Sequence, residues 1–342
     1  LPGTGHSSPT IVGERLYITS ADASAGKRYL LCLNRQTGTT LWQRDVAFAP
    51  FRQHADNSYA SSTPAADDVG VYVSWLNPDK YLLQAFTPDG KDLWSIDLGP
   101  FRSQHMNGGS PIVWGELVIF AVDQDTPGGS FVIAVERKTG QMRWKTPRRS
   151  DNASSSTPCL FEPAGAPAQV ILSNRTEGLV ALDAATGKRL WDVPGAMPLR
   201  CVASPLAAGE LVMANCGEGV ANRVLTAVRP PAQPGDKPEV AYTLKGLAAP
   251  YVPTPIAVRN RLFILTDAGV MHCVELASGK TIYSQRIPDV GSAGFYASPV
   301  CVDGRLLCIT KKGELIVLGT ADKLEILGRG PLGEPTFATP TV

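Results

Sequence analysis

Two loop segments with nearly the same sequence contain most of the side chains that could do chemistry. Phe51-Arg52-Gln53-His54 and Phe101-Arg102-Ser103-Gln104-His105 each place a guanidinium group close to an imidazole ring. Arginine can bind a carboxylate through two parallel hydrogen bonds, and histidine changes its charge near neutral pH. The alternative is that the loops are a duplicated structural element that caps neighbouring repeats. The predicted ligand-binding residues on these loops and their neighbours are Arg52, His54, Asn57, Arg102, His105, Asn107 and Arg200.

A candidate metal site lies in the segment Asp123-Gln124-Asp125. The carboxylates of Asp123 and Asp125 could ligate Ca²⁺, which takes about six to eight oxygen ligands. The segment lacks the glycine and the distal glutamate of an EF-hand loop, so an ordinary acidic turn is the alternative interpretation.

Motifs of well-known enzyme classes are missing from the sequence. It contains no Gly-x-Ser-x-Gly elbow, no His-Glu-x-x-His pair, no phosphate-binding loop and no Cys-x-x-Cys-His haem attachment. No catalytic residue is therefore predicted. The 32 basic and 31 acidic residues nearly cancel, which argues against nucleic acid as a partner. The apolar runs are short, so we expect no membrane-spanning segment.

The elements that must position these loops follow a repeat. A Ser-Pro or Thr-Pro pair, a short apolar strand and a turn with Gly or Asn recur about every 40 to 55 residues, a period typical of propellers and solenoids. Proline lacks an N–H group and is therefore tolerated at the open edge of an innermost strand. The pairs begin at Ser8, Thr63, Ser110, Thr157, Ser204, Thr254, Ser298 and Thr339.

The fourth repeat shows the pattern most clearly. Four short strands are predicted between residues 156 and 191, with the turn Asp183-Ala184-Ala185-Thr186-Gly187 before the last of them. That turn opens a Thr-Gly-x-x-x-Trp signature, which recurs along the chain and is altered to Asp89-Gly90 in one copy. The tryptophans of the four copies are Trp42, Trp94, Trp144 and Trp191.

The segment Ala181-Leu182-Asp183-Ala184-Ala185-Thr186-Gly187-Lys188-Arg189-Leu190-Trp191 resembles the tryptophan-docking motif of the pyrroloquinoline-quinone (PQQ) repeat family of β-propellers. That family includes quinoprotein dehydrogenases and the propeller lipoprotein of the outer-membrane barrel assembly machinery. The resemblance covers essentially the whole chain. It implies that the four tryptophans pack between neighbouring blades and have a structural role.

We therefore predict an all-β fold, a β-propeller of four-stranded antiparallel blades that forms a single domain over residues 1–342. Seven periods are complete and an eighth begins near the end, so the prediction is eight blades with the closing blade incomplete in this chain. Seven blades is the alternative. The predicted repeats are 7–50, 51–100, 101–150, 151–198, 199–248, 249–292, 293–334 and a partial eighth at 335–342.

The resemblance says less about activity, because one fold hosts many functions. Quinone-dependent dehydrogenases of this type resemble one another in having an adjacent Cys-Cys pair and a carboxylate-bound Ca²⁺. None of the seven cysteines of this chain are adjacent. We therefore predict that the protein uses no cofactor, PQQ with Ca²⁺ included.

The predicted function is that of a non-catalytic binding or scaffold propeller whose loop face binds a protein partner or a small carbohydrate-like ligand. The resemblance implies a periplasmic or otherwise extracytoplasmic location, and we expect a monomer. The chain starts at Leu1 without a signal-like stretch, so any targeting segment is expected to have been cut away or to lie upstream. One alternative is an enzyme that acts on an acidic polysaccharide through a His/Arg-lined funnel. The second alternative is a quinone-dependent oxidoreductase.

A disulfide between Cys201 and Cys216 is also predicted. If Ala208-Gly209 is the turn between two strands, counting outward along the ladder places the two cysteines directly opposite each other. Such a pair would indicate an oxidising, extracytoplasmic compartment. The alternative is two buried thiols, because cysteine is often an ordinary core residue.

Overall fold

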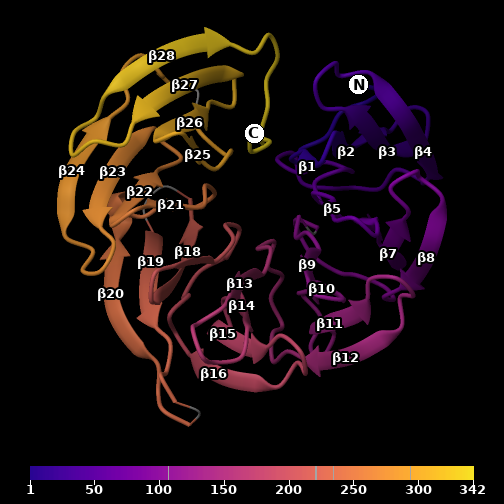
Figure 1. Ribbon diagram of the computed structural model, residues 1–342, viewed down its shortest axis with the longest axis horizontal. Helices are drawn as coiled ribbons and strands as arrows, with labels where there is room; N and C mark the ends of the chain where they lie inside the picture. Colours follow the sequence, from indigo (N-terminus) through magenta and orange to yellow (C-terminus); the bar gives the residue numbers. More distant parts are fainter. Residues whose placement is uncertain (107, 220–221, 234, 293) are drawn as a thin grey trace. The chain divides into compact units, whose positions relative to one another are not determined.

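The computed structural model describes residues 1–106, 108–219, 222–233, 235–292 and 294–342. Within these residues the chain forms seven four-stranded antiparallel sheets and one short 3-10 helix, η1 (Gly246–Ala248). The all-β prediction and the four-stranded blades of a β-propeller are thus confirmed. In each sheet the four strands are hydrogen-bonded in the order of the sequence (Figure 1).

Contacts divide the chain into two compact units. Unit 1 consists of Leu1–Pro158, Ala184–Lys188 and Thr341, and unit 2 consists of Cys159–Asp183, Arg189–Pro340 and Val342. The sheets of unit 1 are β1 (Thr10–Val12), β2 (Arg15–Asp22), β3 (Lys27–Asn34) and β4 (Thr40–Ala47); β5 (Ala65–Ala66), β6 (Val71–Asn77), β7 (Lys80–Phe86) and β8 (Asp92–Asp97); and β9 (Ile112–Trp114), β10 (Leu117–Val122), β11 (Phe131–Glu136) and β12 (Met142–Pro147).

Unit 2 contains the strands of the other four sheets. These are β13 (Cys159–Phe161), β14 (Gln169–Asn174), β15 (Gly178–Asp183) and β16 (Arg189–Val193); β17 (Leu206–Ala208), β18 (Leu211–Glu218), β19 (Asn222–Arg229) and β20 (Glu239–Lys245); β21 (Ile256–Val258), β22 (Arg261–Leu265), β23 (Val270–Glu275) and β24 (Thr281–Arg286); and β25 (Val300–Val302), β26 (Arg305–Ile309), β27 (Glu314–Gly319) and β28 (Ile326–Pro331). Residues 335–342, predicted to begin an eighth blade, contain no strand.

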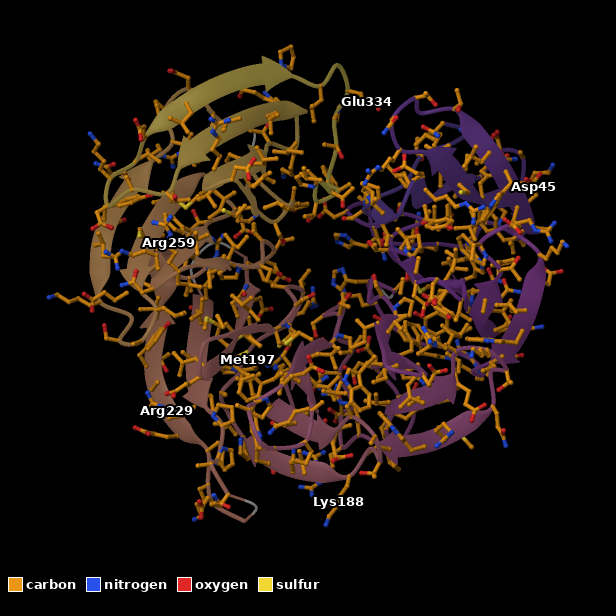
Figure 2. The ribbon with its side chains drawn as sticks, in the orientation of Figure 1. Asp45, Lys188, Met197, Arg229, Arg259 and Glu334 are labelled. Atoms are coloured by element: carbon orange, nitrogen blue, oxygen red, sulfur yellow. The ribbon has the colours of Figure 1, made fainter. Side chains whose placement is uncertain are left out.

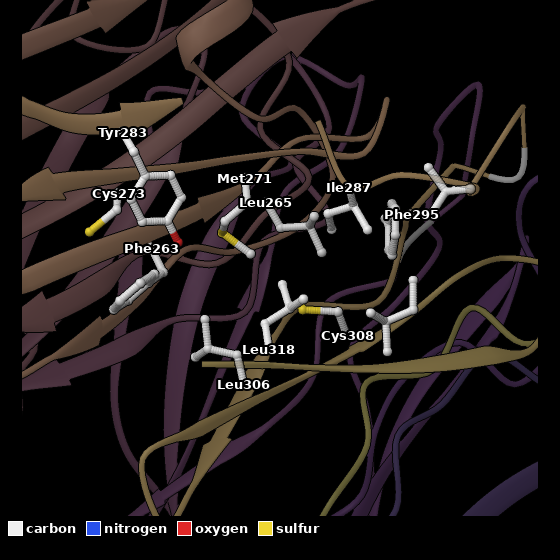
Figure 3. Close-up of a cluster of buried hydrophobic side chains, with 12 residues drawn as sticks. Phe263, Leu265, Met271, Cys273, Tyr283, Ile287, Phe295, Leu306, Cys308 and Leu318 are labelled. Atoms are coloured by element: carbon white, nitrogen blue, oxygen red, sulfur yellow. The ribbon is translucent and has the colours of Figure 1, made fainter. Parts of the chain in front are cut away.

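Burial follows the position of a strand in its sheet. The second strand of the third sheet, β10, is buried at all six positions, which explains its continuous apolar sequence. The fourth strand β4 instead alternates exposed and half-buried residues, and Asp45 on it is exposed (Figure 2). Between the last two sheets of unit 2, Phe263, Leu265 and Met271 share a buried cluster with Leu306 and Leu318 (Figure 3).

Within each unit, the Ser or Thr of a Ser-Pro or Thr-Pro pair donates its backbone N–H to the hydroxyl of the next pair. In unit 1 the Ser8 N–H donates to Thr63 Oγ1 at 3.0 Å, and the Thr63 N–H donates to Ser110 Oγ at 2.9 Å. The Ser110 N–H then donates to Thr157 Oγ1 at 3.0 Å. Each hydroxyl therefore accepts an amide proton from the preceding repeat, while the amide of the same residue reaches the following repeat.

The same relay runs through unit 2. The Ser204 N–H donates to Thr254 Oγ1 at 3.1 Å, and the Thr254 N–H donates to Ser298 Oγ at 3.0 Å. The Ser298 N–H donates to Thr339 Oγ1 at 3.1 Å. Thr339 thus takes the place of an eighth repeat in the relay, although no strand follows it. The open edge of the first strand explains the proline of the motif, and the relay explains its hydroxyl.

Three of the four signature tryptophans dock on the turn of the following sheet. The Nε1–H groups of Trp42, Trp94 and Trp144 donate to the carbonyls of Pro88, Arg137 and Ala184, at 2.9, 2.9 and 3.1 Å. Their rings cover a glycine of the same turn so closely that a Cβ atom there would approach within 2.8 Å or less. Trp144 is buried, whereas Trp42 and Trp94 are half-buried.

Trp191 differs from the other three, because its Nε1–H donates to Gln169 Oε1 in its own sheet at 2.8 Å. The following repeat lacks the Thr-Gly turn on which it could dock. Tyr242 takes over the docking role one sheet later, donating its hydroxyl proton to the Leu276 carbonyl at 3.0 Å above Gly279. A register shift between the third and fourth strands recurs in all seven described sheets; in the first six it lies next to the aromatic residue, and in the seventh Ile326 stands beside it.

His272 on β23 is buried, and its Nε2 lies 3.0 Å from the Leu247 carbonyl. Burial lowers the pKa of this imidazole below 6.5, and the hydrogen bond to Leu247 partly opposes that shift. Among the described residues no helix is long and apolar enough to cross a membrane.

The relay can be tested by replacing Thr63 with valine, which has the same shape but no hydroxyl. The variant removes the acceptor of the Ser8 N–H, and the loss of one such partly buried hydrogen bond costs about 0.5–1.5 kcal/mol. We expect the free energy of unfolding in urea to fall by this amount. Thr40→Val at an exposed position of β4 is the matched control and should change it by less than about 0.5 kcal/mol. Equal effects of the two substitutions would contradict a role for the relay.

The docking of tryptophan on glycine is tested by Gly140→Ala. Gly140 has a φ of 71°, and its added Cβ would lie 2.8 Å from the Trp94 ring. Gly38 occupies the same turn of the first sheet with a φ of 70° and has no heavy atom within 4 Å of such a Cβ. Gly38→Ala should therefore cost only the backbone strain, about 1–2 kcal/mol, and Gly140→Ala about 1–3 kcal/mol more. Equal losses in urea unfolding would show that the ring does not constrain the turn.

Stability should also depend on pH through His272. Because its folded pKa is lowered, the unfolded chain binds the proton more readily, and the free energy of unfolding declines as the pH falls below about 6.5. His272→Gln keeps a donor for the Leu247 carbonyl but cannot titrate, so its decline between pH 8 and pH 5.5 should be shallower. Parallel urea-unfolding profiles for the two proteins over that interval would contradict this assignment.

Candidate functional site

The two duplicated loops follow the fourth strands of the first two sheets of unit 1. Each is anchored by its phenylalanine. Phe101 is buried and packs edge-on against Tyr81, with ring centroids 5.3 Å apart. Phe51 meets the Tyr59 ring at 5.1 Å, and its carbonyl accepts the Tyr59 hydroxyl proton at 2.6 Å. The apolar residue of the duplicated sequence thus fixes each loop and leaves the polar residues near the surface.

The structure brings the histidines of the two loops together. The rings of His54 and His105 lie 4.3 Å apart between centroids, and Asn57 Nδ2 donates to the His105 carbonyl at 2.7 Å. His54 Nδ1 also accepts the Asp56 N–H at 3.2 Å. Three predicted ligand-binding residues therefore form one contact between the loops.

The arginines of the two loops, Arg52 and Arg102, are exposed. The backbone of Arg102 is held on both sides, because its N–H donates to Gln124 Oε1 at 3.1 Å and its carbonyl accepts the Asp125 N–H at 2.8 Å. The predicted binding residue Asn107 lies outside the described residues.

Asp123 and Asp125 have partners other than a metal. Asp123 forms an ion pair with Arg148 at 3.1 Å, and the two side chains are 3% and 2% exposed. The Asp125 carboxylate accepts the N–H groups of Gln104 at 2.9 Å and Ala153 at 2.7 Å. No group of three His, Cys, Asp or Glu residues in the described chain could hold a metal ion. These partners favour the alternative interpretation of the segment as an acidic turn: one carboxylate neutralises a buried arginine, and the other is hydrogen-bonded to two further loops.

Arg200, the remaining predicted binding residue, belongs to unit 2. It forms an isolated bridge with Gly217, and its side chain is hydrogen-bonded to the Tyr251 hydroxyl. Burial raises the pKa of that tyrosine, and Arg200 partly opposes the shift. The Tyr251 ring covers Gly217 so closely that a Cβ there would lie 2.8 Å from it.

The predicted disulfide between Cys201 and Cys216 does not form in the structure. The turn lies at Gly209-Glu210, one residue later than predicted, with Ala208 opposite Leu211. The ladder beside the turn is therefore offset from the predicted one, but the isolated bridge between Arg200 and Gly217 has the predicted register, so Cys201 and Cys216 follow and precede a bridged pair and still remain free thiols. Both cysteines are buried in one apolar cluster of unit 2, and burial raises the pKa of the Cys216 thiol.

Sequence analysis missed the residue at the base of the site, Arg28 on β3. This side chain is 1% exposed, and its guanidinium donates to the Leu76 carbonyl at 2.5 Å and to Asn77 Oδ1 at 3.1 Å. It also lies 4.3 Å from the centre of the Phe48 ring. The one available signal was a lone arginine at the start of an otherwise buried apolar strand.

Arg28 lines a pocket below the two loops. The empty volume of the pocket, measured out to the solvent, is ≈ 340 Å³. The volume available to the centres of water-sized molecules is ≈ 20 Å³. The walls are polar and aromatic. The other lining residues are Phe51, Gln53, Asn57, Ser58, Tyr59, Ala60, Ser61, Ser62, Ser74, Leu76, Tyr81 and Met106.

The chemistry of this pocket suits a small polar or anionic group better than a quinone with Ca²⁺. A quinone site of that type needs adjacent cysteines and clustered carboxylates. The cysteines of this chain are separated in sequence, and the pocket lining contains neither a cysteine nor a carboxylate. The residues present do not fit the cofactor of the dehydrogenases.

Comparisons with known proteins agree with the repeat. Residues 78–231 match the family model described as outer membrane protein assembly factor BamB. An outer membrane protein assembly factor BamB of Burkholderia pseudomallei (strain K96243) is 27% identical over 192 residues, which are 56% of this chain and 42% of that protein. A polyvinylalcohol dehydrogenase of Pseudomonas sp. is 33% identical over 136 residues, 37% of this chain and 19% of that protein. The chain thus spans less than half the length of either relative.

Among solved structures, the crystal structure of BamB from Moraxella catarrhalis matches with a TM-score of 0.68 at 11% identity. The match covers 98% of this chain and 88% of that one, and at this identity it shows the fold alone. Together with the matched family model, it confirms the resemblance predicted from the tryptophan signature: this chain is similar to the BamB-like PQQ-repeat propellers.

Proposed function

We propose that this protein is a non-catalytic, extracytoplasmic propeller that binds a protein partner through the duplicated loops of unit 1. The observation that carries the proposal is the pair of loops, which meet at His54 and His105 above a polar pocket. Matching loops on successive blades form a continuous surface, and loops on a rigid scaffold are where binding residues concentrate.

The family resemblance supports the same function. The matched model and one relative are described as outer membrane protein assembly factors, and such a role requires binding other proteins outside the cytoplasm. The exposed Arg52 and Arg102 offer two-point hydrogen bonding to carboxylates of a partner. We expect the protein to act as a single copy and without a cofactor.

Site-specific photo-crosslinking in the producing cell tests this function. A photoreactive residue at position 52 or 102 should give a discrete adduct with another protein, because both positions are exposed on the proposed surface. Positions 43 and 143, exposed on β4 and β12, are the matched controls and should give no adduct.

Two results would contradict the proposal. The first is an adduct pattern that is the same at all four positions, which would mean that the loops are not a preferred surface. The second is the release of fragments from an acidic oligosaccharide by the purified protein, which would instead favour the polysaccharide enzyme.

A further inference from the structure

We infer that the pocket below the duplicated loops binds a carboxylate group of a peptide, with the guanidinium of Arg28 as its counter-charge. This inference deepens the proposed function and rests on it only for the source of the carboxylate, which is a peptide side chain or a peptide C-terminus.

The first argument is the charge balance of Arg28. Its hydrogen-bond acceptors are the neutral Leu76 carbonyl and the neutral Asn77 amide, and its Nε is buried without a hydrogen-bond partner. Within the described residues no carboxylate forms an ion pair with it. Arg148, which is buried in the same unit, does have one, because it pairs with Asp123. A buried cation without an anion is destabilising, so a missing anion is the natural complement.

The guanidinium remains charged under ordinary conditions. Burial lowers the pKa of Arg28 to about 10, which is still well above neutral pH. The ring of Phe48, 4.3 Å from the guanidinium carbon, stabilises the cation but cannot neutralise it. The pocket therefore has a fixed positive charge at its base.

The walls supply further donors. Ser58 and Ser61 face each other with their Oγ atoms 3.0 Å apart, and Ser74 donates to Ser62 Oγ at 2.8 Å. All four serines line the pocket, and their hydroxyl groups can rotate to donate to an anion. Tyr59 and Tyr81 complete a mixed polar and aromatic wall.

The size of the pocket limits its occupant. A space of ≈ 20 Å³ for water-sized centres exceeds the about 10–15 Å³ that one water needs, and it is far too small for a sugar ring. A carboxylate on a flexible stem fits, whereas the body of the ligand must stay outside the pocket. The outer surface is formed by the loops that contain the exposed Arg52 and Arg102, which favour an acidic segment.

One lining residue also has an unusual backbone. Met106, next to His105, has a φ of 60° although it is not glycine. Such a conformation is disfavoured for residues with a side chain and tends to occur at ligand-binding sites. The backbone conformation of Met106 therefore supports a binding role for this edge of the pocket, because the residue type itself does not favour that conformation.

The test is fluorescence anisotropy of labelled peptides with the full chain. The probes are a six-residue Asp- and Glu-rich peptide with a blocked C-terminus, its Asn and Gln copy, and a neutral six-residue peptide with a free C-terminus. We expect at least tenfold tighter binding of a carboxylate-bearing peptide than of the Asn and Gln copy. Comparison of the first and third probes identifies the source as a side chain or a chain end.

Arg28→Met identifies the residue, because methionine keeps most of the volume and removes the charge. We expect at least a tenfold loss of peptide affinity together with an unchanged or higher thermal midpoint without peptide, since an uncompensated charge has been removed. Lys27→Met is the matched control: it removes the same charge from the neighbouring, exposed position, whose partner is Asp45 at 3.1 Å. This variant should bind peptide within about twofold of the wild type.

Ser61→Ala keeps the test decisive if Arg28→Met does not fold, because it removes a pocket hydroxyl near the surface and should weaken binding severalfold. Equal affinity for all three peptides would overturn the inference, as would unchanged binding by a folded Arg28→Met protein. Either result together with a discrete crosslink at positions 52 and 102 would leave the proposed function standing. Absence of both peptide binding and the crosslink would overturn both.

Discussion

The hydrogen bond from a backbone amide to the hydroxyl of the next repeat is the constraint on which the rest of the structure depends. Each first strand is only two or three residues long, so it has little ladder of its own. The relay from Ser8 to Thr63 to Ser110 connects these short strands at distances of 2.9 to 3.0 Å. The proline that follows each hydroxyl favours an extended backbone at the residue before it, and this orients both the amide and the side chain. One dipeptide thus sets the spacing of successive sheets.

A second contact holds the opposite edge of the sheets. The tryptophan of a fourth strand stands opposite a small residue, for example Trp94 opposite Ala85 and Trp144 opposite Ala134. The small partner leaves room for the ring. The register shift lies beside this pair, on the side of the glycine turn that leads into the fourth strand. Where the glycine turn is missing, as after Trp191, the indole N–H finds an acceptor in its own sheet instead. Docking therefore needs a tryptophan on one repeat and the glycine turn on the following repeat.

The fold could be predicted well from the sequence because the same four-stranded pattern recurs in seven repeats. Proline, glycine and tryptophan each report a local backbone requirement, and local requirements survive in sequence. The site was predicted only in part. His54 and His105 could be paired because their loops are copies. Counting along the ladder also places Cys201 and Cys216 beside the bridge between Arg200 and Gly217, but two opposed cysteines need not be oxidised, and both are free thiols in the structure. For Arg28 the sequence offers only its place in an apolar strand, because the feature that matters is that no carboxylate pairs with it among the described residues, and this depends on contacts across space.

The position of the pocket also explains how a site of this size could be useful. Two serines of its wall, Ser61 and Ser62, directly precede Thr63 of the relay in the sequence. The Ala60 carbonyl accepts the N–H groups of His6 and Ser7, at 3.0 and 2.9 Å, and the Ser62 carbonyl accepts the Thr19 hydroxyl at 3.1 Å. These bonds fix the wall before any ligand arrives, so little conformational entropy is lost on binding. A single buried arginine with prearranged hydroxyl groups can then anchor the end of a flexible partner, while the exposed loop arginines contribute the long-range attraction that brings it there.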